Sequence, residues 1–262
     1  MTITATELTR RPAAAPGAAP GSINVPKSRD LLAEQLQQRI LDGTYASGAL
    51  LPTERELVST TGRSRGSVRE ALRILEAQGL VRTRPGRYGG SVVSQPTDAL
   101  LASHINLFAK RRGVPLRALV EARQALEPMV AYLAAKNRTA DDLAALERIA
   151  ARLDQAAERN VARFLEENAR WHSALAVASH NDLLRALTAS IADLMLEASR
   201  IRNFASPDVR RLVTLAHRRI LQAIAGQDAD AARRRAERDI QAYASHLAAA
   251  VASPRAMRTM RK

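Results

Sequence analysis

Residues 51–79 read LPTERELVSTTGRSRGSVREALRILEAQG and carry a helix start signal on each side of Gly62. In the tetrad at 53–56, Thr and Glu stand at the N-cap and N3 positions of a capping box, which predicts a short helix ending at Gly62. Ser64 can cap a longer helix that carries an apolar stripe and ends at Gly79. Two such helices joined by a tight turn are typical of a helix-turn-helix.

The sequence on both sides completes this pattern. Residues 28–43, SRDLLAEQLQQRILDG, repeat apolar side chains at helical spacing, with Ser28 available as a cap and Gly43 as the end. After the longer helix, two short β-prone runs flank a Gly-rich tip at 85–90, which predicts a hairpin. The order helix, short helix, helix, hairpin is that of a winged helix-turn-helix.

Arginines line one border of the apolar stripe on the longer helix. Arg65, Arg69 and Arg73 recur at intervals of four beside the apolar face. Arginine at the start of a recognition helix can pair with guanine in the major groove, and the helix N-terminus with Ser64 attracts phosphate. Gly66 lets a DNA backbone approach closely. The alternative is a solvated charged face.

The hairpin tip repeats the same chemistry. It carries Arg84, Arg87 and Tyr88 between glycines, so it can reach the minor groove or lie along the phosphates. The alternative is a plain flexible hairpin.

The remainder of the chain predicts a second, all-helical domain. Residues 98–252 show only helical periods, interrupted at six breaks, and we expect a bundle of about six helices. Residues 28–97 form the DNA-binding domain, preceded by a disordered arm at 1–27 and followed after the bundle by a basic tail at 253–262. The fold class is therefore mostly α, with one small β-hairpin.

Composition and charge narrow the class of protein. The 262 residues have a formal net charge of +14, which suits nucleic acid first and an anionic membrane surface second. A genome that favours arginine codons would give the same excess. The absence of cysteine excludes a disulfide framework and a thiolate metal site. No membrane span or signal peptide is recognisable, which predicts a cytoplasmic protein.

The run LPTERELVSTTGRSRGSVREALRILEAQGLV at 51–81 closely resembles the DNA-binding signature of the GntR family of bacterial transcription regulators. The resemblance implies that Arg55, Arg65 and Arg69 are the main DNA contacts. It also implies supporting positions, namely Thr53, Ser64, Ser67 and Gly89, to which the wing tip adds Arg87. Arg63 departs from the family, which often has a small apolar residue there, and we expect it to add a phosphate contact or to shift the helix slightly.

The second domain resembles the FCD effector domain of the FadR branch. The resemblance rests on EARQALEPMVAYLAA at 121–135, ENARWHSALAVASHNDLL at 167–184 and AHRRILQAIAGQDADAARRRAERD at 216–239. It implies a homodimer that binds a small organic acid, with Arg123 holding the carboxylate. From the sequence alone, Arg123 could equally form a salt bridge with Glu121 or Glu127.

Many FCD domains hold a divalent metal with one Asp and three His. The matching positions are Asn168, His172, His217 and Asp239, in which the usual Asp is Asn168 and the last His is Asp239. This set of N and O ligands is compatible with Zn²⁺, Mn²⁺ or Ni²⁺. Lone histidines on amphipathic helices are more often packing residues, and His246 is an alternative ligand.

Taken together, these patterns predict a dimeric transcription regulator, not an enzyme. It would bind a palindromic operator in double-stranded DNA, act as a repressor and respond to a small organic acid. One competing hypothesis is a metal-dependent enzyme that uses His172 and His217, although the chain has no H-E-x-x-H motif. The other is an architectural DNA binder that has no sequence preference.

Overall fold

The structure is a computed structural model, and it describes residues 27–86, 89–202 and 206–252. The expected arm before Lys27 and the basic tail after Ala252 lie outside the described residues, as do Arg87 and Tyr88. The chain divides after Gln95 into two compact units, and each is described separately.

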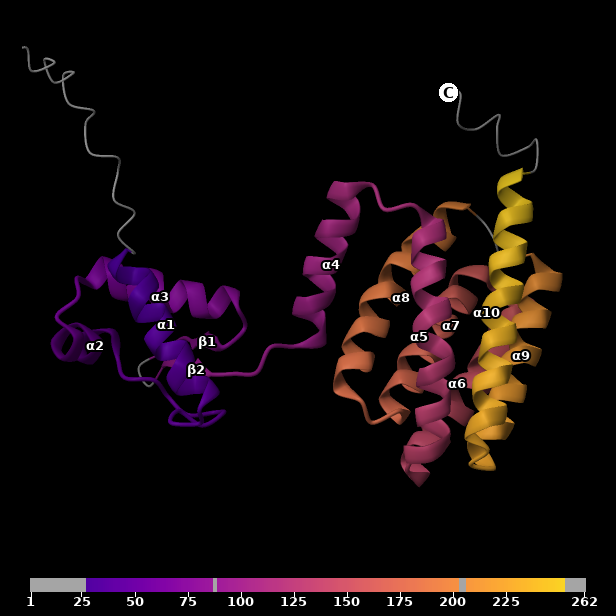
Figure 1. Cartoon of the computed structure of the whole chain (residues 1–262), viewed down its shortest axis with the longest axis horizontal. Helices are drawn as coiled ribbons and strands as arrows, with labels where there is room; N and C mark the ends of the chain where they lie inside the picture. The colour runs from indigo at the N-terminus through magenta and orange to yellow at the C-terminus, as the bar shows by residue number, and fades with distance from the viewer. Residues whose placement is uncertain (1–26, 87–88, 203–205, 253–262) are drawn as a thin grey trace, which may run out of the picture. The chain divides into compact units, whose positions relative to one another are not determined.

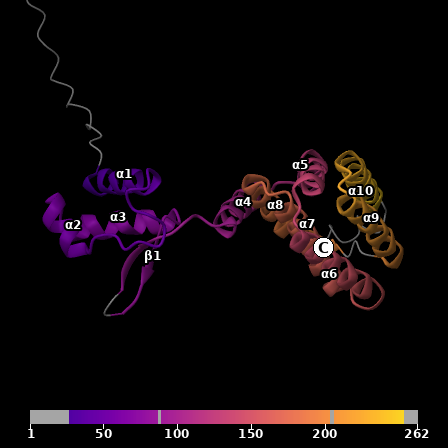
Figure 2. The same ribbon diagram turned by 90° about the horizontal axis from the view of Figure 1, so that it is seen from below.

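The N-terminal unit contains three helices and a two-stranded sheet (Figure 1). In chain order these are α1 (Ser28–Leu41), α2 (Glu54–Thr61), α3 (Arg65–Ala77), β1 (Val81–Arg84) and β2 (Gly90–Val93). The strands are antiparallel, and the register pairs Val81 with Val93 and Arg84 with Gly90. The hairpin projects from the helices in Figure 2, as a wing does. The predicted winged helix-turn-helix is confirmed.

Local capping explains where two of the three helices begin. The Thr53 hydroxyl accepts from the Glu56 backbone at 3.3 Å, and the Glu56 carboxylate accepts from the Thr53 backbone at 2.8 Å, so the predicted capping box is confirmed. The Ser64 hydroxyl accepts from the backbone N–H of Ser67 at 3.2 Å and caps α3. The prediction that Ser28 caps α1 is wrong, because Lys27 is the N-cap and its side chain makes no capping bond.

The core of this unit is built from the apolar faces of all five elements. Val68, Ala71 and Leu75 of α3 are fully buried, and they pack with Leu32 and Leu36 of α1. Leu72, expected on the same buried arc, is only partly covered. This packing fixes α3 by its apolar stripe and leaves the neighbouring arginine border at the surface.

The C-terminal unit is entirely helical in its described residues. Its helices are α4 (Asp98–Arg112), α5 (Leu116–Asn137), α6 (Ala140–Arg159), α7 (Val161–Ala178), α8 (Asp182–Arg202), α9 (Pro207–Ala225) and α10 (Ala229–Ala252). The helix boundaries fall at the six predicted breaks, which give seven helices, one more than the expected number of about six. Helix α5 lies along α10, α6 along α7, and α4 along α8 (Figure 1).

A small-residue core holds the bundle together. Trp171, the single tryptophan of the chain, is fully buried among residues of α5, α6, α7, α9 and α10, where many contacts are alanines. Alanine faces allow helices to approach closely, so the bundle is tight around Trp171. Among the described helices, none is long and apolar enough to cross a membrane.

Candidate nucleic-acid interface and effector cavity

The N-terminus of α3 presents polar and charged side chains at the surface. Arg65 is exposed and has no ion-pair partner among the described residues. Ser67 lies one turn inside the helix and shares a 3.0 Å hydrogen bond with Ser64. A side chain placed at Gly66 would meet nothing closer than the Ser64 hydroxyl at 3.9 Å. Packing within the chain therefore does not require glycine at position 66, whereas close approach by a partner would.

Two other arginines of this surface differ in their surroundings. Arg69 donates to the Glu54 carboxylate on α2 at 2.8 Å, and both side chains are about half exposed or more, at 64% and 45%. Exposed pairs of this kind contribute at most about 1 kcal/mol, so Arg69 can exchange Glu54 for another anionic or polar partner. Arg55 is exposed on α2 and lacks a partner in the described part of the chain.

Arg63 is turned inward, away from the open surface. Its Nη1 donates to the Ser28 hydroxyl at 2.8 Å and ties the turn before α3 to the start of α1. The same contact explains why Ser28 does not cap α1. In this arrangement Arg63 positions α1 relative to α3, and a phosphate contact would require it to leave Ser28.

The wing tip depends on glycine for backbone reasons. A Cβ at Gly89 would collide with the carbonyl oxygen of Arg84, and the Gly89 N–H donates to the Gly86 carbonyl at 2.9 Å. Gly89 therefore shapes the tip, and the exposed Arg82 and Arg84 carry the positive charge of the described wing.

The effector unit contains a cavity of about 280 Å³ between four helices. Arg123 from α5, Asn168 and His172 from α7, His217 from α9 and Asp239 from α10 all line it. A smaller recess of about 40 Å³ adjoins it and shares Arg123, Asn168 and His172. The structure thus brings the predicted effector residue and all four predicted metal positions to one site.

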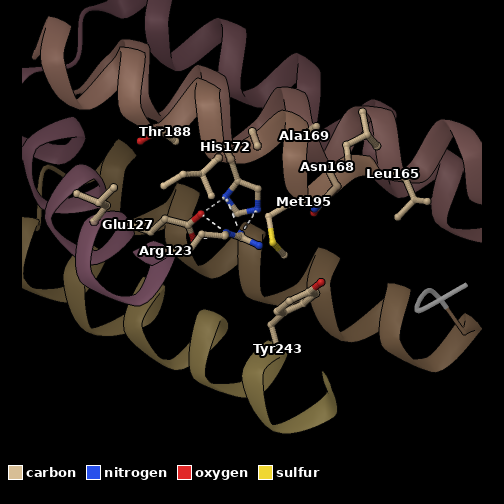
Figure 3. Close-up of a pocket in the computed structure, with 13 residues that line it drawn as sticks. Arg123, Glu127, Leu165, Asn168, Ala169, His172, Thr188, Met195 and Tyr243 are labelled. Atoms are coloured by element: carbon tan, nitrogen blue, oxygen red, sulfur yellow. Dashed lines mark hydrogen bonds and ion pairs between the residues drawn. The ribbon is translucent and has the colours of Figure 1, made fainter. Parts of the chain in front are cut away.

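Arg123 stands at the centre of this site in a buried network (Figure 3). Its Nε and Nη2 donate to the two Glu127 carboxylate oxygens at 2.6 and 3.1 Å, across one turn of α5. Nη2 also lies 2.9 Å from His172 Nε2, and the guanidinium lies 5.4 Å from the centre of the Tyr243 ring. Arg123 therefore forms the salt bridge with Glu127 and lines the cavity at the same time.

Burial and neighbouring charges set the protonation states of His172 and Arg123. Burial, together with the nearby charges of Arg123 and His217, holds the pKa of His172 well below its usual range. Burial alone would lower the pKa of Arg123, but the Glu127 carboxylate outweighs it and the pKa is raised. His172 is therefore neutral at pH 7 and accepts at Nε2, while Nδ1 faces Glu127 Oε1 at 3.4 Å.

The proposed metal ligands suit a divalent cation in type and partly in position. The Asn168 Oδ1 and both ring nitrogens of His217 are buried and find no hydrogen-bond partner within the described residues. His217 Nε2 lies 3.4 Å from Asp239 Oδ2, close to the spacing of about 3.3 Å between two ligands of one zinc ion. His172 differs, because the Arg123 guanidinium already faces its Nε2.

As arranged, the site is not a preformed metal centre. Across residues 27–86, 89–202 and 206–252, no group of three or more His, Cys, Asp or Glu side chains is positioned to hold an ion. An ion at all four positions would require Arg123 to leave His172, since two cations cannot share one lone pair.

Three residues at this site had little or no sequence signal. Glu127 was visible only as a salt-bridge partner one turn after Arg123, and Tyr243 lies one turn after Asp239 on the same face of α10. Thr188 of α8 carried no signal. The hydroxyls of Thr188 and Tyr243 are buried with no partner among the described side chains, and both residues line the recess.

Comparison with known proteins agrees with both units. Residues 29–89 match the family described as bacterial regulatory proteins, gntR family, and residues 118–242 match the FCD domain. The Glc operon transcriptional activator of Escherichia coli (strain K12) is 31% identical over 207 residues, covering 74% of this chain and 79% of the relative. The chain belongs to the GntR family of transcription regulators.

Other members of the GntR family support the same conclusion. The galactonate operon transcriptional repressor of Escherichia coli (strain K12) is 32% identical, covering 78% of this chain and 89% of that protein. The structure of Streptococcus agalactiae GntR superposes with a TM-score of 0.63 at 27% identity, covering 83% of this chain and 99% of that one. Because these relatives are regulators, the prediction that the chain is not an enzyme is confirmed.

Proposed function

We propose that this GntR-family regulator is a homodimeric repressor of the FadR branch that leaves a palindromic operator when a small organic acid binds its FCD domain. The observation that carries the proposal is the buried Arg123, whose guanidinium lines a 280 Å³ cavity while a separate unit carries the DNA-binding helices. A chain with both features can convert ligand binding into a change of DNA affinity, and it would act in the cytoplasm, where the DNA lies.

On the DNA side, Arg65 and Arg69 read bases in the major groove. Both lie exposed in the first turns of α3, where recognition helices contact base edges. Thr53, Arg55, Ser64 and Ser67 lie at or near the starts of α2 and α3, where free backbone N–H groups favour phosphate. Arg87 adds a contact from the wing tip, which Gly89 shapes, and Arg63 joins the set when it leaves Ser28 for a phosphate.

The proposed dimer matches the symmetry of the proposed operator. One recognition helix covers one half-site, so a palindrome requires two copies of the head. The exposed Leu107 and Phe108 on α4 give the effector unit an apolar surface that a second copy can cover. A fragment of residues 98–252 should therefore sediment as a dimer at micromolar concentration, and a monomer would move the interface to the other unit.

A carboxylate effector fits the charge of the cavity. The planar guanidinium of Arg123 matches a carboxylate, and the neutral His172 beside it adds no competing negative charge. The relative that represses a galactonate operon is named for a carboxylate, which supports this class of effector.

A divalent ion is proposed as a second component of the site. Asn168, His172, His217 and Asp239 would hold Zn²⁺, Mn²⁺ or Ni²⁺, and the ion would supply a positive charge to which an acid can bind. The Arg123 side chain would then leave His172 and hold the other end of the same carboxylate. Metal analysis of the purified protein, with the His172→Ala/His217→Ala variant as control, tests this point directly.

The test of operator recognition is Arg65→Ala measured on two DNA sequences. Loss of a base contact should cost about 1–3 kcal/mol on the specific site and less on random DNA at the same salt concentration. Arg82→Ala on the wing is the matched exposed control and should weaken both sequences equally. Equal losses on both sequences for Arg65→Ala would make Arg65 a phosphate contact and favour the architectural hypothesis.

A further inference from the structure

We propose that the effector is an amphipathic monocarboxylic acid, with its carboxylate at Arg123 and an apolar body of several carbons between α7, α9 and α10. This rests on the proposed function and names the class of acid. The proposed ligand differs from galactonate, a polyhydroxylated acid that appears in the name of one relative.

The polar head of such an acid has a defined place beside Arg123. Arg123, Asn168, His172 and Tyr243 line both the cavity and the recess, so they form the boundary between them. The buried Asn168 Oδ1 and Tyr243 hydroxyl lack partners in the described part of the chain. Buried polar atoms of this kind are normally satisfied, so a ligand or water with polar atoms belongs at this boundary.

The apolar side chains of the cavity lie mostly beyond this boundary. They are Phe164, Val209, Leu212, Val213, Leu215 and Ile240, and the polar side chains there are His217, Asp239, His246 and the arginines at the edge. A hydroxyl pressed against such side chains loses its water without gaining a partner, which weakens binding by about tenfold for each hydroxyl. A sugar acid has a hydroxyl on every carbon of its chain, and each hydroxyl that faces one of these apolar side chains suffers this loss, whereas methylene groups gain from the same contact.

The size of the cavity sets the length of the body. Its volume of about 280 Å³ is nearly twice that of an apolar cavity of about 150 Å³ that binds benzene in another protein. By that comparison, a body on the order of ten heavy atoms fills the space.

The arginines at the edge of the cavity do not form a second built anion site. Arg235 donates to the backbone carbonyl of Arg219, and Arg219 and Arg238 are exposed. Solvated charges of this kind raise the local concentration of anions and steer them to the opening. We therefore assign the far end of the ligand to apolar contact.

The experiment is a chain-length series on the full-length protein by calorimetry, with acetate, butyrate, hexanoate and octanoate. Affinity should rise by about fourfold for each methylene that is buried. Galactonate and octanol should both bind more weakly than octanoate, because galactonate lacks the apolar body and octanol lacks the charge. Nonanedioate tests whether a second carboxylate is accepted at the far end.

Two kinds of variant separate the parts of the site. Leu212 is 54% exposed and lines the cavity, so Leu212→Ser should weaken octanoate severalfold and leave acetate unchanged. Leu183→Ser is the matched control, since Leu183 is 66% exposed and lies outside the cavity. Arg123→Met/Glu127→Leu removes the head contact without leaving a buried charge, and Tyr243→Phe removes only one hydroxyl.

The outcomes distinguish this inference from the proposed function. Affinity that is independent of chain length, or tighter binding of galactonate, would overturn the amphipathic ligand while leaving an acid effector if the Arg123 variant loses binding. Tighter binding of nonanedioate than of octanoate would overturn the apolar far end. If no acid binds, or if the Arg123 variant binds as well as wild type, both the inference and the proposed acid effector are wrong.

Discussion

The buried pair of Arg123 and Glu127 makes a quantitative prediction for the stability of the FCD domain. The Arg123 side chain is 10% exposed and that of Glu127 is 8%, and two hydrogen bonds of 2.6 and 3.1 Å join them. Replacing Glu127 by Leu leaves a buried guanidinium without its counter-charge. Such a loss costs about 3–5 kcal/mol, and the adjoining cavity admits water, so we expect about 3 kcal/mol.

The same helix supplies the matched control one and a half turns earlier. Arg117 and Glu121 have the same i,i+4 spacing, with a distance of 3.6 Å, but their side chains are 85% and 56% exposed. Glu121→Leu should change the free energy of unfolding by no more than about 0.5 kcal/mol, because water screens an exposed pair. The difference between the two substitutions isolates the effect of burial.

The assay is denaturant unfolding followed by tryptophan fluorescence. Trp171 is the single tryptophan, fully buried in the FCD domain and stacked on His217 at 4.8 Å, so its signal reports this domain alone. The double variant Arg123→Met/Glu127→Leu removes both charges and should regain most of the lost stability. A cost below about 1 kcal/mol for Glu127→Leu, or no recovery in the double variant, would refute the reasoning.

Three further predictions concern operator binding, metal binding and acid stability. Gly66→Ala should leave the unfolding of the DNA-binding unit unchanged or slightly improved, since nothing lies within 3.9 Å of the added methyl, but should weaken operator binding in a gel-shift titration. Arg123→Met/Glu127→Leu should tighten Zn²⁺ binding by about tenfold or more in a competition assay with a chelator, because a cation leaves His172 and no unpaired carboxylate stays buried beside it. Burial by itself raises the pKa of Asp142. Hydrogen bonds from Thr139 and His180 together have the larger, opposite effect, so the pKa of Asp142 lies below its usual value of 3.8. The ionised Asp142 carboxylate therefore stabilises the fold above about pH 3.8, and this stabilisation is lost as the pH falls through the lowered pKa. The free energies of unfolding of Asp142→Asn and wild type should differ at neutral pH and become equal below the lowered pKa in an acid titration.

The DNA-binding unit was largely predictable because its signals are local. A capping box joins residues three apart, so Thr53 and Glu56 mark the start of α2 without any knowledge of the fold. The failure at Ser28 has the opposite cause, since its hydroxyl is engaged by Arg63, which lies 35 residues away. A contact over that distance has no sequence pattern.

The effector site shows the same division more sharply. The sequence by itself determined the helices, their breaks and the type of each candidate side chain, because helical periodicity and caps act within a few residues. It left open whether Arg123 forms a salt bridge or faces a ligand, and only the tertiary structure shows that it does both. Only the tertiary structure shows that the Arg123 guanidinium lies against His172 Nε2. It alone also brings apolar residues of α7, α9 and α10 together in the lining of the cavity. The physical reason is that a cavity between four helices depends on how their faces pack across more than a hundred residues of chain, and that arrangement has no local period to be read.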